Sequence, residues 1–492
     1  MHRSEEVSGD FISEDVDDVL RSARPAPLII AVLIFAAVVS SLESTMMANA
    51  LPQMIVIFHT NAADASWMLT AYTLVGAVSA ALCGRLGDLY SRRNMIIILL
   101  LISAAGSIVS MSTDTLTGVV AGRALQGVAG GLLPLCFGLA RENLPKKRVP
   151  VATAWIGGAT VLSGASGMVI SGFLIDHTSW HYIFVTTAVG GLLAAAASSL
   201  LPKSTVAAKV QRIDWVGGVL FAPAIALVLF GVTKSRTWTW LDSRTVGTML
   251  AGLVLMAVWA WWELRLDSPM INVRSLANRK LALTTLATMA VAAGPVGVTG
   301  YLLNLIKQSP EIAPVGLGLS ATTAGLLAFC TGIVGFLLAP LSGRISARTG
   351  SRRALIIGTI FGITNAIVLS LFCGNVVGVV VSSVFLSVAT TFMLTSLPNL
   401  VIESVPAENT SEATGVNAVA QTAFSGVGIS VAALILSKST VSGTPFSTKS
   451  AFFEVFGLIG GCSALALVLA LFISRTPRTT ADARPAVAVQ EA

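Results

Sequence analysis

The sequence predicts an all-α polytopic membrane protein, and its composition provides the main evidence. Of its 492 residues, 54% are hydrophobic and only 11% are charged, whereas about 25% of residues are charged in an average soluble domain. Its mean hydropathy of +0.82 agrees with this. A soluble protein of this length needs a polar coat, so lipid must be the solvent for most of this surface. The 44 glycines suit membrane helices, because small residues let their backbones pack closely.

Fourteen apolar segments are long enough to cross a bilayer, since a transmembrane helix needs about 20 such residues. In chain order they are 28–51, 66–83, 95–112, 116–139, 152–174, 182–201, 215–233, 246–264, 281–303, 321–341, 354–373, 376–398, 413–436 and 452–474. Continuous apolar runs such as 95–106 exclude an outer-membrane barrel, whose strands alternate apolar and polar residues.

Positive charge predicts the orientation, because cytosolic loops are enriched in Lys and Arg. With the N-terminus inside, six of the 31 Lys and Arg fall in outer loops and Arg123 falls within a segment, which leaves 24 on the cytosolic side. We therefore expect both termini in the cytosol. The net charge of +7 then reflects contact with inner-leaflet lipids, and no nucleic-acid partner is needed to explain it.

Two basic loops, one in each half of the chain, indicate an internal repeat. Residues 84–93 read GRLGDLYSRR and residues 343–353 read GRISARTGSRR. Their offset of about 260 residues, or eight segments, fits two six-helix halves with two extra helices between them. Internal repeats are typical of alternating-access carriers, whose substrate site lies between the halves.

The repeat and the charge pattern predict five parts of the chain. They are a disordered acidic cytosolic tail (1–27), an N-terminal six-helix bundle (28–201), two inserted linking helices with cytosolic flanks (202–280), a C-terminal six-helix bundle (281–474) and a cytosolic tail (475–492). The first tail holds seven acids and has no apolar stretch of the kind found in a signal peptide.

Enzyme chemistry is not predicted. The four histidines fall in the first tail and at the outer ends of segments, without metal-ligand spacing to a Cys or an acid. The five cysteines lie within apolar runs, which is typical of small buried hydrophobic residues. No Walker loop is present to bind ATP. We therefore expect no catalytic residue, no metal and no cofactor.

The loop 84–93 resembles the cytosolic signature of the major facilitator superfamily, Gly-x-Leu-x-Asp-x-x-x-Arg-Arg. The fourteen segments are similar to its 14-helix drug:proton antiporter branch. Further similarities to that branch are Leu42-Glu43-Ser-Thr45 and Ala50-Leu51-Pro52, Trp67, Tyr72, Arg123-Ala-Leu-Gln126-Gly127, Ser179-Trp180 and Asp214-Trp215-x-Gly217. The resemblance implies a multi-pass protein of the cell membrane. It also implies a monomer among lipids that exchanges an amphipathic small-molecule substrate for protons.

Three positions depart from the pattern of the branch. Glu43 stands where the branch usually has Asp, and Ala48 stands where Asn is expected. The antiporter signature Gly-Pro-x-x-Gly-Gly of the fifth segment reads GMVISG at 167–172. This last departure bears on antiport more than on transport itself.

Glu43 and Arg123 are the predicted proton-coupling residues. A charge at bilayer depth costs about 2.5–3.5 kcal/mol on insertion scales, so Glu43 needs a partner or a function. A carboxyl that takes up a proton and faces each side of the membrane in turn would couple proton flow to transport. The alternatives are a permanent ion pair with Arg123, at a similar depth, and recognition of a cationic substrate by Glu43.

The basic loops supply a predicted conformational gate. In the resembling family, the acid and the basic residues of this motif tie helix ends together in one state and release them in the other. The gate candidates are Gly84, Asp88, Arg92, Arg93, Arg348, Arg352 and Arg353. The second loop has no acid at the matching place, so we expect an asymmetric latch. Positive-inside anchoring is the alternative explanation of the arginines.

Polar residues within segments are candidates for the wall of a substrate cavity, although such a residue more often forms a hydrogen bond between helices than a contact with a ligand. They are Gln126, Trp155, Asn304, Asn365, Asn417 and Gln421. The glycines of the fifth segment are predicted to allow close helix packing, and they include Gly157, Gly164, Gly167 and Gly172.

Three functional hypotheses follow from the sequence. The first is a proton-coupled exporter of amphipathic or lipophilic small molecules, as in multidrug efflux and antibiotic resistance. The second is a carrier of one specific metabolite, lipid or siderophore, for which several polar side chains would converge on one point. The third is a membrane receptor or scaffold that does not transport.

Overall fold

The computed structural model describes residues 25–202, 214–266, 269–298, 316–318, 321–438 and 447–474, together with Leu302 and Leu305. Residues 1–24 and 475–492 of the two predicted tails lie outside the described residues. So do residues 203–213 of the predicted linker and the cavity candidate Asn304.

Helices build the whole described fold. The first part of the chain forms α2 (Ala26–Ile57), α3 (Ala62–Ala65), α4 (Trp67–Leu89), α5 (Arg92–Met111), α6 (Leu116–Gln126), η1 (Gly127–Gly131), α7 (Leu132–Asn143), α8 (Val149–His177) and α9 (His181–Ser198). The rest forms α10 (Trp215–Trp238), α11 (Ser243–Glu263), η2 (Val273–Ala277), α12 (Arg279–Val291), η3 (Ala292–Val296), α14 (Ala321–Thr349), α15 (Ser351–Phe372), α16 (Val376–Ile402), η4 (Ala407–Asn409), α17 (Thr410–Lys438) and α18 (Lys449–Phe472).

Thirteen helices in the described part of the chain are long and apolar enough to cross a membrane. The predicted segment that is not among these thirteen is the ninth, 281–303, which begins as α12 and continues through the π-helical turn η3 with Pro295. Its last residues fall partly outside the described range. The predicted all-α polytopic fold is therefore confirmed.

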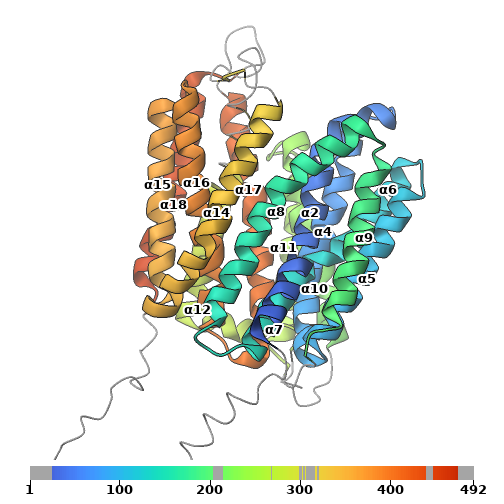
Figure 1. Ribbon diagram of the computed structural model, residues 1–492, viewed down its shortest axis with the longest axis vertical. Coiled ribbons are helices and arrows are strands. Elements are labelled where there is room, and N and C mark those ends of the chain that lie inside the picture. The colour runs from blue at the N-terminus through green and yellow to red at the C-terminus, as the bar shows by residue number, and fades with distance from the viewer. Residues whose placement is uncertain are drawn as a thin grey trace, which may run out of the picture.

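The helices form two bundles that stand side by side (Figure 1), with α2–α9 in one and α12–α18 in the other. Between the bundles, α4 packs on α17 and α8 packs on α14. The inserted helices α10 and α11 pack on each other, and α10 also contacts α4 and α17. Helix α2 begins and α18 ends at the lower end of the molecule in Figure 1, which we call the terminal face; the opposite end is the far face.

The two basic motifs lie mostly within helices rather than in the predicted loops. Residues 84–89 form the last turns of α4, and the second motif similarly lies within the end of α14. A tight turn follows in each case. Ser91 accepts a hydrogen bond from the backbone N–H of Asn94 at the start of α5, and Gly350 has φ of +91° before α15. The expectation of loops was wrong because these helices continue beyond their apolar stretches.

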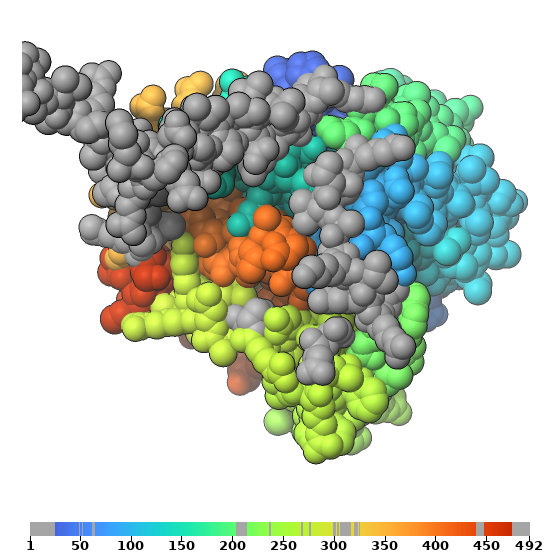
Figure 2. All heavy atoms as spheres, turned by 90° about the horizontal axis from the view of Figure 1, so that it is seen from below, coloured from blue at the N-terminus to red at the C-terminus, as the bar shows by residue number. Residues whose placement is uncertain are grey.

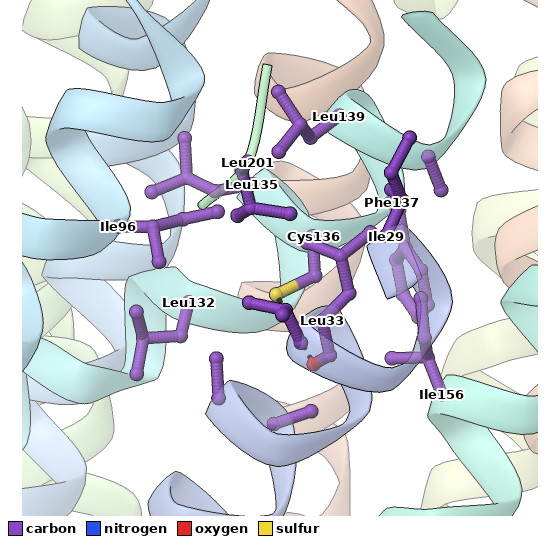
Figure 3. Close-up of a cluster of buried hydrophobic side chains, with 14 of the residues drawn as sticks. Ile29, Leu33, Ile96, Leu132, Leu135, Cys136, Phe137, Leu139, Ile156 and Leu201 are labelled. Carbon is purple, nitrogen blue, oxygen red and sulfur yellow. Dashed lines mark hydrogen bonds between the residues drawn. The ribbon is translucent and has the colours of Figure 1, made fainter. Parts of the chain in front are cut away.

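The interior of the first bundle is packed by aliphatic side chains from several helices. Cys136 of α7 lies among Ile29, Leu33, Leu132 and Ile156 (Figure 3). All five cysteines are free thiols. Dispersion contacts between such side chains hold membrane helices together where lipid supplies no hydrophobic driving force.

Candidate functional site

Glu43 lies about midway along α2 and is 1% exposed. Its Oε1 accepts a hydrogen bond of 2.6 Å from the Ser103 hydroxyl of α5. Its Oε2 is also buried and accepts no hydrogen bond from any described residue. A buried carboxylate oxygen with no donor is energetically costly, whereas a protonated carboxyl carries no net charge to desolvate.

Arg123 of α6 lies next to Glu43 but does not pair with its carboxylate. The guanidinium donates from Nη1 to the backbone oxygen of Glu43 at 3.0 Å and from Nε to the backbone oxygen of Met68 at 3.2 Å. Its Cζ also lies 4.2 Å from the centroid of the Tyr72 ring. The structure thus brings the two predicted residues together, with the arginine held by backbone oxygens and an aromatic face.

Gln126 extends this network away from the centre of the molecule. Its Oε1 accepts from Arg123 at 2.9 Å, and its Nε2 donates to the Ser107 hydroxyl at 2.6 Å. Ser107 in turn lies 3.1 Å from the Thr187 hydroxyl of α9. Gln126 is fully buried inside the first bundle, so it orients Arg123 and does not line either of the two cavities described below.

A small cavity of about 110 Å³ lies between the two bundles. Leu133, Phe137 and Thr160 line it from the first bundle, and Asn417 and Gln421 of α17 line it from the second. The Asn417 side-chain oxygen accepts a hydrogen bond of 2.9 Å from the Thr288 hydroxyl. The cavity is therefore mostly apolar, with Thr160 on one side and a few polar groups of α17 on the other.

The other cavity candidates lie elsewhere. Trp155 of α8 packs edge to face against Phe336 of α14, with ring centroids 5.0 Å apart, so it joins the two bundles. Asn365 is fully buried inside the second bundle, where its Oδ1 accepts from the Ser382 hydroxyl at 2.7 Å. Asn417 and Gln421 thus share a cavity, whereas Trp155 and Asn365 do not join them there.

Asp88 ties the end of α4 to the beginning of α17 at the terminal face. Its carboxylate accepts hydrogen bonds from the backbone N–H groups of Ser411 at 3.3 Å and Glu412 at 2.9 Å. These N–H groups belong to the first turn of α17, where the helix dipole favours a negative charge. Gly84 is equally close to α17, because a Cβ at this position would lie 2.5 Å from the Ser411 carbonyl oxygen.

Arg92 completes this junction. Its guanidinium pairs with Asp88 at 2.7 Å and with Glu142 of α7 at 2.9 Å. Its Nη2 also donates to the backbone oxygen of Ala407 at 2.8 Å, across the boundary between the bundles. Figure 2 views the terminal face from below, with orange residues of the α16–α17 region at its centre between the blue-green first bundle and the yellow-green segment.

The remaining gate candidates lie within single bundles or in solvent. Arg93 donates to the backbone oxygen of Ser199 beyond the end of α9 at 2.6 Å, and Arg352 donates to that of Ala470 near the end of α18 at 2.9 Å. The two arginines thus satisfy the C-terminal carbonyls of the last helix in each bundle. Arg348 and Arg353 are exposed.

Sequence reasoning missed two residues of the terminal face. Arg85 pairs with Glu412 at 3.1 Å, and the other carboxylate oxygen of Glu412 accepts from the backbone N–H of Asn272 at 2.6 Å. Residues 269–273, which follow the inserted helices, are thereby attached to the junction of α4 and α17. The sequence did contain a signal for this pair: Glu412 is an acid in the first turn of an apolar helix, and a buried acid needs a partner.

The predicted packing glycines of α8 face two neighbouring helices. Gly167 approaches the Thr45 hydroxyl of α2 so closely that a side chain would collide with it, and a Cβ at Gly164 would lie 3.6 Å from the same residue. A Cβ at Gly157 would lie 3.5 Å from the Leu394 carbonyl oxygen of α16. Gly172 lies in the last turns of the same helix.

A family model described as "Major Facilitator Superfamily" matches residues 33–313 and 285–490, which together cover nearly the whole chain. The chain belongs to the major facilitator superfamily. This facilitator is therefore a multi-pass protein of the plasma membrane.

Curated relatives of this facilitator include exporters. The tetracenomycin C resistance and export protein of Streptomyces glaucescens is 30% identical over 345 residues, which are 68% of this chain and 61% of that protein. A multidrug resistance protein B homolog of Mycobacterium tuberculosis is 25% identical over 66% of this chain and 60% of that protein. The facilitator thus spans about three fifths of the length of these relatives. The uridine/deoxyuridine transporter of Lactococcus lactis is 26% identical over 72% of this chain and 74% of its own length.

Solved structures share the fold of this facilitator. The human organic anion transporter MFSD10 superposes with a TM-score of 0.66 at 13% identity, over 92% of this chain and all of that one. The proton:xylose symporter XylE superposes with a TM-score of 0.63 at 16% identity, over 91% and 96% of the two chains.

Proposed function

We propose that this facilitator is a proton-coupled exporter of amphipathic or lipophilic small molecules that works by alternating access. The environment of Glu43 carries the proposal. It is a buried carboxyl in mid-helix with one oxygen bonded to Ser103, one oxygen without a donor, and no ion pair that would hold it permanently charged. Such a group can gain or lose a proton without breaking a salt bridge.

Arg123 supports proton coupling by staying fixed while Glu43 changes charge. It is held by Met68, Gln126 and the backbone of Glu43, so its position does not depend on the Glu43 carboxylate. Its positive charge stabilises the deprotonated carboxyl at a distance. When the carboxyl meets the outer side it would take up a proton, and when it meets the cytosol it would release one.

The junction at the terminal face supports alternating access. We propose that Asp88, Arg92 and Gly84 form a gate that closes this face when the Asp88 carboxylate meets the first turn of α17. The proposal places the terminal face in the cytosol and takes the facilitator as a monomer. The second motif also packs across the bundle boundary, where Gly343 closely approaches Pro150 and Val151 of α8, but it has no acid in the place of Asp88, so the latch is asymmetric.

Export is favoured over a carrier of one polar metabolite by the cavity between the bundles. The amide side chains expected to bind a specific polar substrate do not all converge there, because Asn365 lies apart from Asn417 and Gln421, and this cavity is mostly apolar. The similarity to a tetracenomycin C export protein and a multidrug resistance homolog agrees with the same choice.

The proposal is tested in proteoliposomes that contain a pH-sensitive dye. Wild-type protein and Glu43→Gln are compared under an imposed pH gradient, with lipophilic cations, uncharged drugs and organic anions added in turn. We expect substrate-dependent proton movement in the wild type and its loss in Glu43→Gln, because an amide of the same shape cannot bind and release a proton.

Glu454→Gln is the matched control, since Glu454 is an exposed carboxyl on α18. It should behave as the wild type. Proton movement that persists in Glu43→Gln would show that this carboxyl is not the coupling group. Failure of every compound to move protons in the wild type would contradict the proposed function.

A further inference from the structure

A second and larger cavity lies at the side of the first one and is walled partly by an inserted helix. Its volume is about 430 Å³, within the range of pockets that hold small molecules. Helix α4 contributes Thr70 and Thr73, α17 contributes Thr422 and Ser425, and α10 contributes Leu229 and Thr233. Because Ser66 before the first turn of α4 also lines it, the cavity lies towards the far face.

The threonine hydroxyls of this cavity offer hydrogen-bond acceptors rather than donors. Thr70, Thr73, Thr233 and Thr422 each donate their proton to the carbonyl oxygen four residues earlier in their own helix, at 2.8–3.0 Å. A hydroxyl has one donor and two acceptor lone pairs, so the oxygens that line the cavity can still accept. A guest that matches them must bring O–H or N–H donors.

The charge around the cavity disfavours a cationic guest. No acidic side chain is among the described residues that line it, so a buried cation would find no counter-charge there. The Lys234 ammonium lies nearby on α10, 4.9 Å from the centroid of the Trp67 ring. Trp67 also stacks on Phe230 with ring centroids 5.5 Å apart, which fixes α10 against the beginning of α4.

Gln421 lies at the boundary between this second cavity, which we call the lateral cavity, and the cavity between the bundles, because it lines both of them. Its side chain makes no hydrogen bond to another described residue, although its amide can both donate and accept. A molecule in the lateral cavity therefore contacts Gln421 at the boundary with the cavity between the bundles.

We propose that the lateral cavity between α4, α10 and α17 binds an uncharged amphipathic molecule through hydroxyl or N–H groups that donate to its threonine oxygens. The inserted helix α10 is thus a wall of the binding site and not only a link between the bundles. The inference rests on the proposed export function, for which it names the substrate class and a binding site.

Photolabelling tests the site with three probes of one shape. The first is a diazirine derivative of estradiol (the diol), which is uncharged and has two hydroxyl groups. The second is the dimethyl ether of the diol, which lacks hydrogen-bond donors, and the third is a trimethylammonium derivative of that ether. The full chain is labelled in lipid nanodiscs and the labelled peptides are identified by mass spectrometry. We expect saturable labelling of α4, α10 and α17 by the diol, and labelling about tenfold weaker by the other two probes because each loses a hydrogen bond or gains an unpaired charge.

Variants of Thr233 distinguish a lost acceptor from a filled cavity. Thr233→Val removes the hydroxyl at nearly constant volume, and Thr233→Leu also fills space, so both should weaken labelling by the diol, by about tenfold in the case of Leu. Thr186→Leu is the matched control, because Thr186 is an exposed helical threonine of α9 with the same hydrogen bond to its own helix, also of 2.8 Å. It should label as the wild type.

The outcomes separate this inference from the proposed function. Equal labelling by the diol and its ether, or labelling unchanged in Thr233→Leu, would overturn the lateral site even if proton-coupled transport through Glu43 holds. Diol labelling that is lost in Thr233→Leu supports the site, and it does so even if Glu43→Gln still moves protons and the coupling proposal fails.

Discussion

Individual residues in this transporter act through partners that are far away in the sequence. Glu43 meets Ser103, 60 residues later, and Asp88 meets Glu412, 324 residues later. In both cases a carboxyl is buried in a low-dielectric interior, where its hydrogen bonds decide whether the charged form is tolerated. Glu43 has one donor and an oxygen without one, whereas Asp88 has a cation and two backbone N–H groups. The Asp88 carboxylate thus has the partners that a charged form requires, whereas the Glu43 carboxylate lacks them.

Asp88→Asn should open the terminal face. Asparagine keeps the size but loses the charge that pairs with Arg92 and the N-terminus of α17, and removing one partner of a buried ion pair costs about 3–5 kcal/mol. The measurement uses a Thr414→Cys variant, because Thr414 lines the cavity between the bundles. We measure how fast this cysteine is alkylated by an impermeant maleimide supplied at the terminal face. Labelling should become faster in Asp88→Asn.

The control for this experiment is Asp176→Asn, because Asp176 is an exposed aspartate near the C-terminal end of α8, away from the terminal face. Its labelling rate should equal that of the parent protein. A rate that does not rise in Asp88→Asn would contradict the proposed gate.

Helices meet across the bundle boundary at glycines. A Cβ at Gly415 of α17 would collide with the Ala80 carbonyl oxygen of α4, and one at Gly158 of α8 would collide with the Ala339 Cβ of α14. Both glycines lie in the half of their helices that is nearer to the terminal face, so the bundles are in close contact in that half. Further towards the far face the side chains of α4 and α17 line the lateral cavity instead. The packing of these two helix pairs thus sets which face is closed.

Gly415→Ala should prevent α4 and α17 from closing and should lower the transport rate by about tenfold or more, because the methyl group meets backbone and not a flexible side chain. Gly457→Ala on α18 is the matched control, since nothing lies within 4 Å of a Cβ there. The control should transport normally and gain about 0.5–1 kcal/mol in stability from replacing a helical glycine. Transport rates and Tm values of both variants in the same lipid provide the comparison; equal rates would show that this approach is not needed.

At the scale of the whole molecule, the two bundles are joined by inserted helices that also take part in the site. Helix α10 lines the lateral cavity, and residues 269–273 beyond α11 are bound to the junction of α4 and α17 through Glu412 and Arg85. Movement of α17 relative to α4 would therefore be transmitted to the linking segment. The inserted helices touch both the proposed binding site and the proposed gate.

The orientation of the molecule can be tested with reporter fusions in a bacterial host. Alkaline phosphatase, which folds only outside the cytosol, should be inactive when fused after residue 474 and active when inserted in the turn 239–242 between α10 and α11. Green fluorescent protein at the same two positions should give the opposite pattern. The reverse result at both positions would place the terminal face outside and would invert the proposed gate.

Much of the fold could be predicted from the sequence because it depends on local properties. Lipid imposes a minimum length on each apolar segment, so segment positions and the all-α polytopic class follow from hydropathy. The ends were less accurate, as the helical residues 84–89 illustrate, because a helix can extend past the hydrocarbon core wherever its polar side chains find partners. The sequence placed Glu43 and Arg123 at a similar depth, but it could not show that the guanidinium binds the backbone oxygen of Glu43 rather than its carboxylate.

The sequence by itself determined that this protein is a helical multi-pass membrane protein, with an acid in its first apolar segment and a charged motif at the end of its second. The tertiary structure alone decided which of the polar residues face a cavity. Gln126 and Asn365 are buried inside the bundles and hydrogen-bonded there to Ser107 and Ser382, whereas Gln421 lies where two cavities meet. The physical reason is that the position of each membrane-spanning segment depends on the local hydropathy of the chain. Whether a polar side chain in a span faces a cavity depends instead on the helix that packs against it, and that helix lies far away in the sequence.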